Sequence, residues 1–254
     1  MNPFILSSFL CSIALADPVP NTFELSTRAT STLIPTSCFD STSTLESYFD
    51  YAYPWGDTHN GAAIMLESNA VIDPAGTLTL TAVYTGPQSD DSSISYNSGT
   101  VYAKQSFTVE ASGGLDFSAS FIAPTVTGTW PAFWLTATSG WPPEIDMAEW
   151  KGDGKISFNT FNTSSVVATD DITYSDPGEF HSVKAELRDE NGSDVSVTFY
   201  LDGTEITTQY AEGYVGQSMY LIIDLQMEGS SGSPGPTSNT TYQIKDLEII
   251  SYNP

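Results

Sequence analysis

The sequence predicts an all-β fold, a sandwich or jelly roll of many short strands, on two observations. Apolar and polar residues alternate with period two along most of the chain, as they do in strands with one buried face. Turn signals separate these runs at short intervals, and only one segment has a helical pattern. Many short strands without a second long helix are typical of two packed antiparallel sheets.

The first expected element is a short helix near the N-terminal end of the domain. Ser43–Glu46 resembles a capping box, and apolar residues follow at helical spacing at Leu45, Tyr48, Phe49 and Ala52. The stretch before it is rich in Ser, Thr and Pro and has no periodicity. It is compatible with a short linker or an irregular first strand.

The strands that follow are predicted from alternation. Apolar residues alternate with threonine over 77–82, share one face over 115–121, and alternate with charged residues over 183–188. The pattern returns over 195–201. The turn signals that bound these runs are Asp73–Gly76, Ser112–Gly114, Glu190–Gly192 and Asp202–Gly203. No internal repeat or change in composition indicates a second domain.

The first residues resemble a secretory signal sequence. Phe4–Leu15 is an apolar run too short to span a bilayer, and it ends in Ala14-Leu15-Ala16, a small-x-small cleavage pattern. Cleavage there divides the chain into a signal peptide of residues 1–16 and a single domain of residues 17–254. We therefore expect a secreted, extracellular protein that is not anchored in a membrane.

The charge balance limits the partners. The chain has 31 Asp and Glu against 7 Lys and Arg, a formal net charge of −24, and 40% of its residues are hydrophobic. A chain with this much apolar surface folds instead of remaining a disordered acidic tail. Its negative field repels nucleic acid and anionic lipid surfaces. We expect a monomer whose partner is neutral or cationic, with neither nucleic acid nor a membrane as a partner.

Cysteine and histidine usage indicates neither a disulfide nor a metal centre. Signal cleavage would remove Cys11 and leave Cys38 alone, and His59 and His181 are isolated in the sequence. We expect no catalytic metal and no cofactor, whereas a structural calcium on the acidic surface stays open. In a secreted eukaryotic chain, three sequons would accept N-glycans: Asn162, Asn191 and Asn239.

One acidic segment carries the chemistry. Glu144 and Asp146 are two residues apart, so on a strand both side chains point to the same face. Glu149 is an odd number of residues from Glu144 and should face the other way. It rejoins the carboxylate face if one extra residue, Met147 or Ala148, forms a β-bulge, a feature common beside active sites.

Three carboxylates on one face suit a glycosidase, which needs one ionised nucleophile and one acid that holds a proton. In so acidic a chain the pattern alone is also compatible with a solvated strand. The apolar Ile145, Met147 and Ala148 between the carboxylates instead predict a strand buried on its other face. We expect four nearby tryptophans to stack on sugar rings: Trp130, Trp134, Trp141 and Trp150. For Trp134 a position in the core is equally open.

At these residues the sequence resembles glycoside hydrolase family 16, the laminarinase-like retaining endo-glycanases, which carry Glu-x-Asp-x-x-Glu in a bulged form. The resemblance covers about residues 63–252. Its further matches are Tyr96–Gly99, Trp130–Trp134, Phe180–Val183, Phe199–Gly203 and Met219–Ile223.

This resemblance implies a concanavalin A-like β-jelly roll of two curved antiparallel sheets, with a substrate cleft on the concave face. It implies that Glu144 is the nucleophile, Asp146 its electrostatic helper and Glu149 the general acid/base of a double displacement. The implied substrate is a neutral polysaccharide. A β-1,3-glucan or mixed-linkage β-1,3(4)-glucan is expected first, and a β-1,3-galactan stays open.

The chain departs from the family pattern at three places. Pro142-Pro143 replaces the usual glycine before the first glutamate, Thr100 stands where many members have arginine, and Asn159 stands where laminarinase-like members often have histidine. These positions contact substrate in relatives, so Asn159 is expected to bind substrate and the glucan assignment is weakened. A transglycosylase and a lectin-like module are the alternatives, although a lectin does not need both Glu144 and Glu149.

Overall fold

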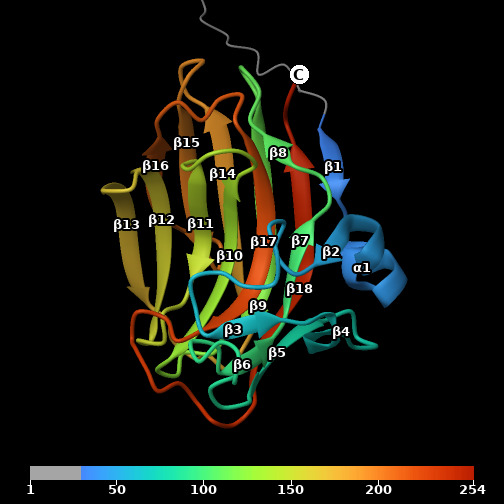
Figure 1. The fold of residues 1–254 in the computed structure, drawn as a ribbon. Helices are drawn as coiled ribbons and strands as arrows, with labels where there is room; N and C mark the ends of the chain where they lie inside the picture. The colour runs from blue at the N-terminus through green and yellow to red at the C-terminus, as the bar shows by residue number, and fades with distance from the viewer. Residues whose placement is uncertain (1–29) are drawn as a thin grey trace, which may run out of the picture.

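The computed structural model describes residues 30–254, which form a β-jelly roll of two sheets packed face to face (Figure 1). The all-β expectation is therefore confirmed. The expected signal peptide, residues 1–16, lies outside the described residues.

The eight-stranded sheet, named the cleft sheet here, lies in front in Figure 1. Its spatial order is β13 (Val166–Thr173), β12 (Lys155–Thr163), β11 (Glu144–Glu149), β10 (Thr129–Ala137), β17 (Ser218–Met227), β7 (Thr100–Ala103) and β2 (Phe49–Tyr51), with β8 (Phe107–Thr108) paired to β17.

The ten-stranded sheet, the back sheet, lies behind it. Its order is β16 (Thr204–Ala211), β15 (Val195–Leu201), β14 (His181–Asp189), β9 (Gly114–Ile122), β18 (Thr240–Ser251), β5 (Leu78–Tyr84), β6 (Tyr96–Ser98) and β3 (Ala63–Met65), with β1 (Ser31–Ile34) on β18 and β4 (Ala70–Ile72) on β5. Pairing is antiparallel in both sheets apart from β3 and β6, which are parallel.

The expected helix exists but begins and ends earlier than the pattern indicated. The helix α1 (Thr42–Tyr48) has Ser41 as its N-cap, and Ser41 Oγ accepts a 3.2 Å hydrogen bond from the Thr44 backbone N–H. The proposed Ser43–Glu46 capping box is wrong, because the Thr44 side chain completes the box. Phe49 leaves the helix to pair with β7. Short 3-10 helices span Thr36–Phe39 and Glu67–Asn69.

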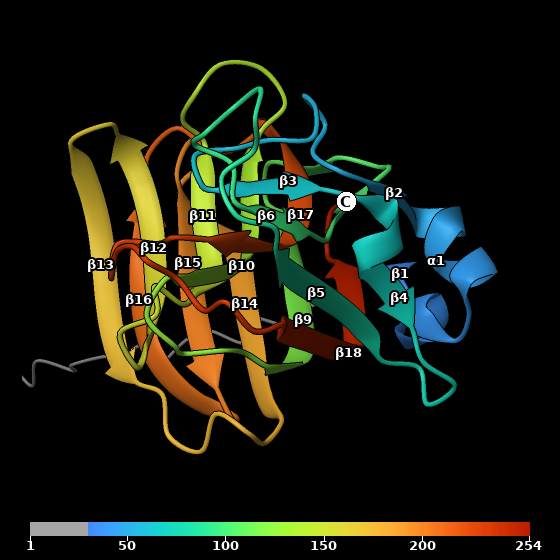
Figure 2. The same ribbon diagram turned by 60° about the horizontal axis from the view of Figure 1, so that its bottom comes forward.

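The helix α1 lies at one edge of the sandwich, away from β11, β12 and β13, in both ribbon views (Figures 1 and 2). Because of this position α1 does not contribute to the cleft described below, which is built by strands and their connecting loops.

No helix within residues 30–254 is both long and apolar enough to cross a membrane.

The core fills the space between the sheets, and alternation decides which residues enter it. On β9 the side chains of Leu115, Phe117, Ala119 and Phe121 are buried, as the period-two pattern predicted. Facing side chains from the cleft sheet include Phe133, Leu135 and Ile223. Phe121 stacks on Tyr242 with ring centroids 5.5 Å apart. Large buried rings of this kind supply much of the hydrophobic stabilisation.

The Asp202-Gly203 hairpin shows how local chemistry sets strand register. Both residues have positive φ values, 49° and 73°, and they join β15 to β16. A two-residue turn of this handedness matches the twist of antiparallel strands, and glycine enters it without a steric penalty.

Candidate active site

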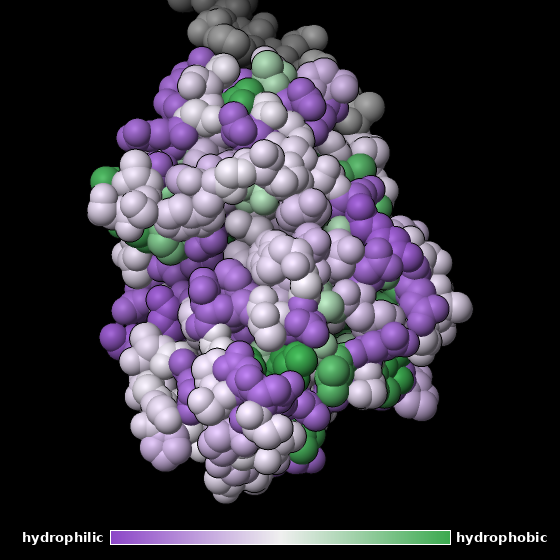
Figure 3. Space-filling view, in the orientation of Figure 1, coloured by the Kyte–Doolittle hydropathy of each residue, from purple (hydrophilic) through white to green (hydrophobic). Residues whose placement is uncertain are grey.

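A cleft of about 660 Å³ crosses the outer face of the cleft sheet. The space-filling view of this face shows a hollow with hydrophilic residues beside it (Figure 3). Carboxylates and aromatic rings dominate the lining. Its members are Trp55, His59, Asn60, Trp130, Ala132, Trp134, Thr136, Ala137, Gly140, Trp141, Glu144, Asp146, Glu149, Lys151, Phe161, Asp224 and Gln226.

The expected β-bulge is present and brings the three carboxylates to one face. On the β12 side Asp146 lies opposite Asn159 and Glu149 lies opposite Ser157, so two residues of β11 oppose one of β12. On the β10 side the register also shifts, and Met147 is the unpaired residue. Glu144, Asp146 and Glu149 consequently all line the cleft.

Glu144 is held by an indole at the rim. Trp141 Nε1 donates a 2.8 Å hydrogen bond to Glu144 Oε2, and the backbone N–H of Glu144 donates to the Tyr214 hydroxyl at 2.8 Å. Burial raises the pKa of Glu144 to about 7, against the opposing effect of the Trp141 hydrogen bond, and the nearby Glu149 charge adds to the rise. The unliganded site therefore favours a protonated Glu144 at mildly acidic pH.

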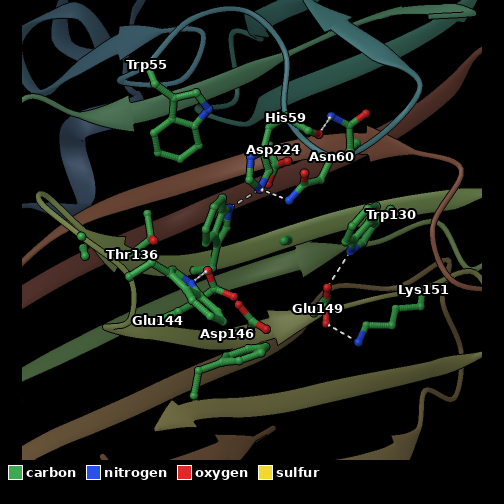
Figure 4. A pocket seen from close by; sticks show the side chains of 17 residues that line it. Trp55, His59, Asn60, Trp130, Thr136, Glu144, Asp146, Glu149, Lys151 and Asp224 are labelled. Carbon is green, nitrogen blue, oxygen red and sulfur yellow. Dashed lines mark hydrogen bonds and ion pairs between the residues drawn. The ribbon is translucent and has the colours of Figure 1, made fainter. Parts of the chain in front are cut away.

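Glu149 has three donors around its carboxylate. Its Oε1 accepts from Trp130 Nε1 at 2.6 Å, and its Oε2 accepts from Asn159 Nδ2 at 3.0 Å. Lys151 Nζ lies 2.8 Å from the same Oε2, and the ion pair is visible in Figure 4. Burial would lower the pKa of Lys151, but the nearby carboxylates, Glu149 first, raise it. Lys151 therefore remains charged.

Asn159 lies beneath the carboxylates, not among the lining residues. Its amide donates to Asp146 Oδ2 at 2.8 Å as well as to Glu149, and the residue is 2% exposed. The expectation that Asn159 contacts substrate is wrong for this geometry, because its side chain is covered and both its amide hydrogens point at carboxylates. Burial, together with the charges of Glu149 and Glu144, raises the pKa of Asp146.

Three of the four predicted sugar-stacking tryptophans line the cleft. Trp130 and Trp141 lie at the rim, while Trp134 is 5% exposed and lies deeper. The expectation for Trp150 is wrong. It is 0% exposed and packs between the sheets against Phe121, Tyr174 and Tyr242. Trp150 directly follows the cleft-facing Glu149, and alternation turns it into the core.

Several cleft residues were not predicted to belong to the site. Trp55 and His59 come from the loop between β2 and β3, and His59 stacks on Trp134 with centroids 5.5 Å apart, so His59 is not isolated. Asp224 and Gln226 lie on β17, two residues apart. Their signal was available, since polar residues at alternate positions interrupt an otherwise apolar strand.

The residues 30–254 contain no group of three or more His, Cys, Asp and Glu arranged to hold a metal ion. Cys38 is a free, buried cysteine whose Sγ lies 3.8 Å from the Leu247 carbonyl oxygen. The cleft itself presents three carboxyl groups of β11 with hydrogen-bond donors arranged around them. A pair of glutamates in such a cleft can act as nucleophile and acid on a glycosidic bond.

Comparisons with known proteins support this chemistry. The chain is 47% identical over 238 residues to a galactan endo-β-1,3-galactanase of Flammulina velutipes, covering 91% of this chain and 93% of the relative. No family model matches the chain.

Solved structures have the same fold. An endo-1,3-β-glucanase from Streptomyces sioyaensis superposes with a TM-score of 0.68 at 19% identity, over 94% of this chain and 100% of that one. SCLam, a non-specific endo-β-1,3(4)-glucanase from family GH16, superposes with a TM-score of 0.66 at 16% identity, over 87% and 91% of the two chains. The chain belongs to glycoside hydrolase family 16.

Proposed function

We propose that the protein cleaves internal β-1,3 linkages of a β-1,3-galactan by double displacement with retention of configuration. The observation that carries the proposal is the bulge in β11, which turns Glu144 and Glu149 toward one cleft. The galactanase relative favours galactan over the glucan that the sequence motif put first.

In the first step, a Glu144 carboxylate oxygen attacks the anomeric carbon and the glycosidic bond breaks. Glu149 gives its proton to the departing oxygen, so the leaving chain departs as an alcohol and the sugar stays as an ester on Glu144. The Trp141 indole hydrogen bond holds the Glu144 carboxylate in place for this attack. Asp146 lies between the two glutamates and is fixed by Asn159.

In the second step, a water attacks the same carbon and breaks the ester bond. Glu149, now ionised, takes the proton of that water, and Glu144 leaves as a carboxylate, which restores both groups. Trp130, Asn159 and Lys151 stabilise the ionised Glu149 of this step through three contacts. Preorganised donors of this kind stabilise charge that develops during a reaction.

Burial favours a protonated Glu144 in the unliganded site, whereas the first step uses this group as a carboxylate. Positive charge that develops at the anomeric carbon favours ionised Glu144, so the reacting sugar itself supplies the electrostatic change that the attack needs. Lys151 Nζ lies 2.8 Å from Glu149 Oε2 and places a positive charge beside the second glutamate.

Exposed indoles give the cleft more than one surface for sugar rings. Trp55 is 47% exposed and Trp141 is 45% exposed, and they belong to different loops. Tyr53 stacks behind Trp55 with an interplanar angle of 4°, which fixes the ring as a platform. Several stacking surfaces suit an internal segment of a polysaccharide, and this supports endo cleavage.

A product profile tests the proposal. Purified protein is incubated with β-1,3-galactan, laminarin, mixed-linkage glucan and agarose, and products are resolved by size over time. The proposal expects galactan to yield a ladder of oligosaccharides early in the reaction, and Glu144→Ala to yield none. Preferred cleavage of laminarin, or release of single sugars only, would overturn it.

We also propose that the protein acts outside the cell as a monomer on a neutral polysaccharide, without nucleic acid or membrane as a partner. The apolar run at residues 4–15 and the net charge of −24 support this. N-terminal sequencing of protein from the culture medium should begin at Asp17, and size-exclusion chromatography should give a single-chain mass. Cell-retained protein that begins at Met1 would contradict the secretion part.

A further inference from the structure

Asp224 is a buried carboxyl on the cleft wall that the mechanism does not use. It is 3% exposed, and it lies on β17 among the residues that line the cleft. The Tyr53 hydroxyl donates to its Oδ2 at 2.7 Å and Trp134 Nε1 donates to its Oδ1 at 3.0 Å. Within residues 30–254 no Lys or Arg forms an ion pair with Asp224.

The sheet register places Asp224 across from Glu149. Ala132 of β10 pairs with Glu149 on one side and with Asp224 on the other. Two strand spacings separate the Cα atoms of the two acids, about 9.6 Å. Ala132 presents only a methyl group between them, so a sugar ring seated over Ala132 has an acid on each side. Figure 4 shows Asp224 and Glu149 on separate strands of this wall.

A carboxylate in this position is costly to the fold. A buried acid without a cationic partner loses hydration that hydrogen bonds replace only in part. Burial raises the pKa of Asp224 to about 7, although Tyr53 and Trp134 oppose the rise. The nearby His59 does not supply a cation at neutral pH, because burial lowers its pKa. Buried acids with perturbed pKa values in clefts gather at functional sites.

The two protein donors leave acceptor capacity on the carboxyl. Each oxygen of an ionised carboxylate accepts two hydrogen bonds; Trp134 and Tyr53 occupy one on each oxygen, and the backbone N–H of Asp224 itself adds a further contact. Because Asp224 lines the cleft, the acceptor capacity that remains on its carboxylate is available to a bound sugar. Sugars that differ at one carbon are distinguished by the direction of one hydroxyl, and a fixed polar acceptor is the group that reads that direction.

We propose that Asp224 accepts a hydrogen bond from a ring hydroxyl of the sugar seated over Ala132, beside the scissile bond, and selects substrates by that hydroxyl. Tyr53 and Trp134 position the carboxyl for this contact. The inference rests on the proposed function, because the sugar concerned is the galactose whose linkage is cleaved. It adds a specificity residue on β17 to the carboxylates of β11.

The test combines Asp224→Asn with deoxygenated substrates. The amide is isosteric, its oxygen can accept from Trp134 and its NH₂ can donate to the Tyr53 hydroxyl, so the fold keeps its contacts while the cleft gains a donor in place of an acceptor. Aryl β-1,3-galactobiosides that lack the 2-, 4- or 6-hydroxyl of the reducing-side galactose are the probes. Asp116→Asn is the matched control, because Asp116 is a 5% exposed carboxyl in the back sheet.

The inference expects D224N to lower kcat/KM on the intact galactobioside by about 10- to 100-fold. For the wild type, kcat/KM on one deoxy substrate should fall by a similar factor relative to the intact substrate. For D224N, kcat/KM on that same deoxy substrate should fall by less than about 2-fold relative to the intact substrate. Tyr53→Phe should show a smaller loss with the same pattern. D116N should keep the wild-type ratio between intact and deoxy substrates even if its Tm falls.

D224N that stays within about 2-fold of the wild type, or that keeps the full wild-type discrimination at all three positions, would overturn the inference. If D224N does not fold by circular dichroism, the Y53F pattern decides, and full discrimination in Y53F overturns it. A wild type that does not cleave β-1,3-galactan refutes the proposed function instead. The deoxy series is then made on the β-1,3-glucan oligosaccharide that it cleaves.

Discussion

Trp130 donates a 2.6 Å hydrogen bond from its indole Nε1 to Oε1 of Glu149. The ring lies on β10 and the carboxylate on the adjacent β11, so one side chain both lines the cleft and orients the proposed acid/base. A sugar ring that stacks on Trp130 is thereby placed relative to the proton donor. One indole thereby couples the position of the substrate to the position of the proton donor.

Trp130→Phe keeps an aromatic face and removes the N–H donor. Since the ring still supports the sugar, KM should change little, whereas kcat should fall by about tenfold because Glu149 loses an orienting hydrogen bond. Trp130→Ala should lower kcat and also raise KM. Steady-state kinetics on galactan oligosaccharides measure both constants, and a W130F variant with an unchanged kcat would contradict the orienting role.

Asn159→Asp should be more harmful than Asn159→Ala. The amide donates to both Asp146 and Glu149, so Asp in its place removes both donors and adds a fourth carboxyl group to the cluster at a buried position. We expect N159D to lose at least about 100-fold in kcat and to unfold at lower temperature. Ser157→Ala on the same strand, whose hydroxyl contacts Asp171, is the control and should stay near wild type. Equal activity of N159D and wild type would exclude the positioning role.

Lys151→Met should shift the pH dependence of the reaction. The variant lacks the ammonium that lies 2.8 Å from Glu149 Oε2, so the charge beside the proposed acid/base changes and the alkaline limb of kcat/KM should move upward. Lys155→Met removes a more exposed cation that pairs with Asp171 at 3.6 Å and does not line the cleft, and it should leave the limb in place. A K151M profile that superposes on the wild type would show that this ion pair does not govern the proton.

Stability should fall as pH rises from about 4 to about 7. The pKa values of Glu144 and Asp224 are raised to about 7 by burial, whereas unfolded carboxyls titrate near 4. The folded state therefore binds more protons over this window, and the free energy of unfolding decreases with pH until both groups ionise. Glu144→Gln and Asp224→Asn should each flatten the curve and raise Tm at pH 7. Thermal unfolding across pH 4–8 measures this, and a wild-type Tm that rises over the window would refute it.

The sequence predicted the features that depend on parity along a strand. The odd separation of Glu144 and Glu149 required a bulge, and the structure contains it at Met147. The same rule, applied to Trp150, would have placed that ring in the core, because it follows a cleft-facing residue. The four apolar residues of β9 also obeyed alternation.

Contacts between distant segments were outside the reach of local patterns. Tyr53 and Asp224 are 171 residues apart, and the sheet order β10-β17-β7-β2 brings β17 near the segment that follows β2. His59 looked isolated because its partner Trp134 lies on β10, 75 residues further along the chain. Asn159 was expected to contact substrate by family analogy, but the register with Asp146 places its amide beneath the carboxylates. Such positions follow from topology, which a single sequence does not specify.

Azide rescue of two alanine variants tests the central assignment most directly. In Glu144→Ala the nucleophile is gone, so hydrolysis should fall by several orders of magnitude, and azide should attack an activated aryl glycoside from the vacated side to give the inverted glycosyl azide. In Glu149→Ala the nucleophile remains, so azide should intercept the glycosyl enzyme and give the product of retained configuration. NMR of the two azide products provides the measurement. The account predicts inversion for E144A and retention for E149A; the opposite assignment would exchange the two roles, and wild-type activity in both variants would contradict the glycosidase mechanism itself.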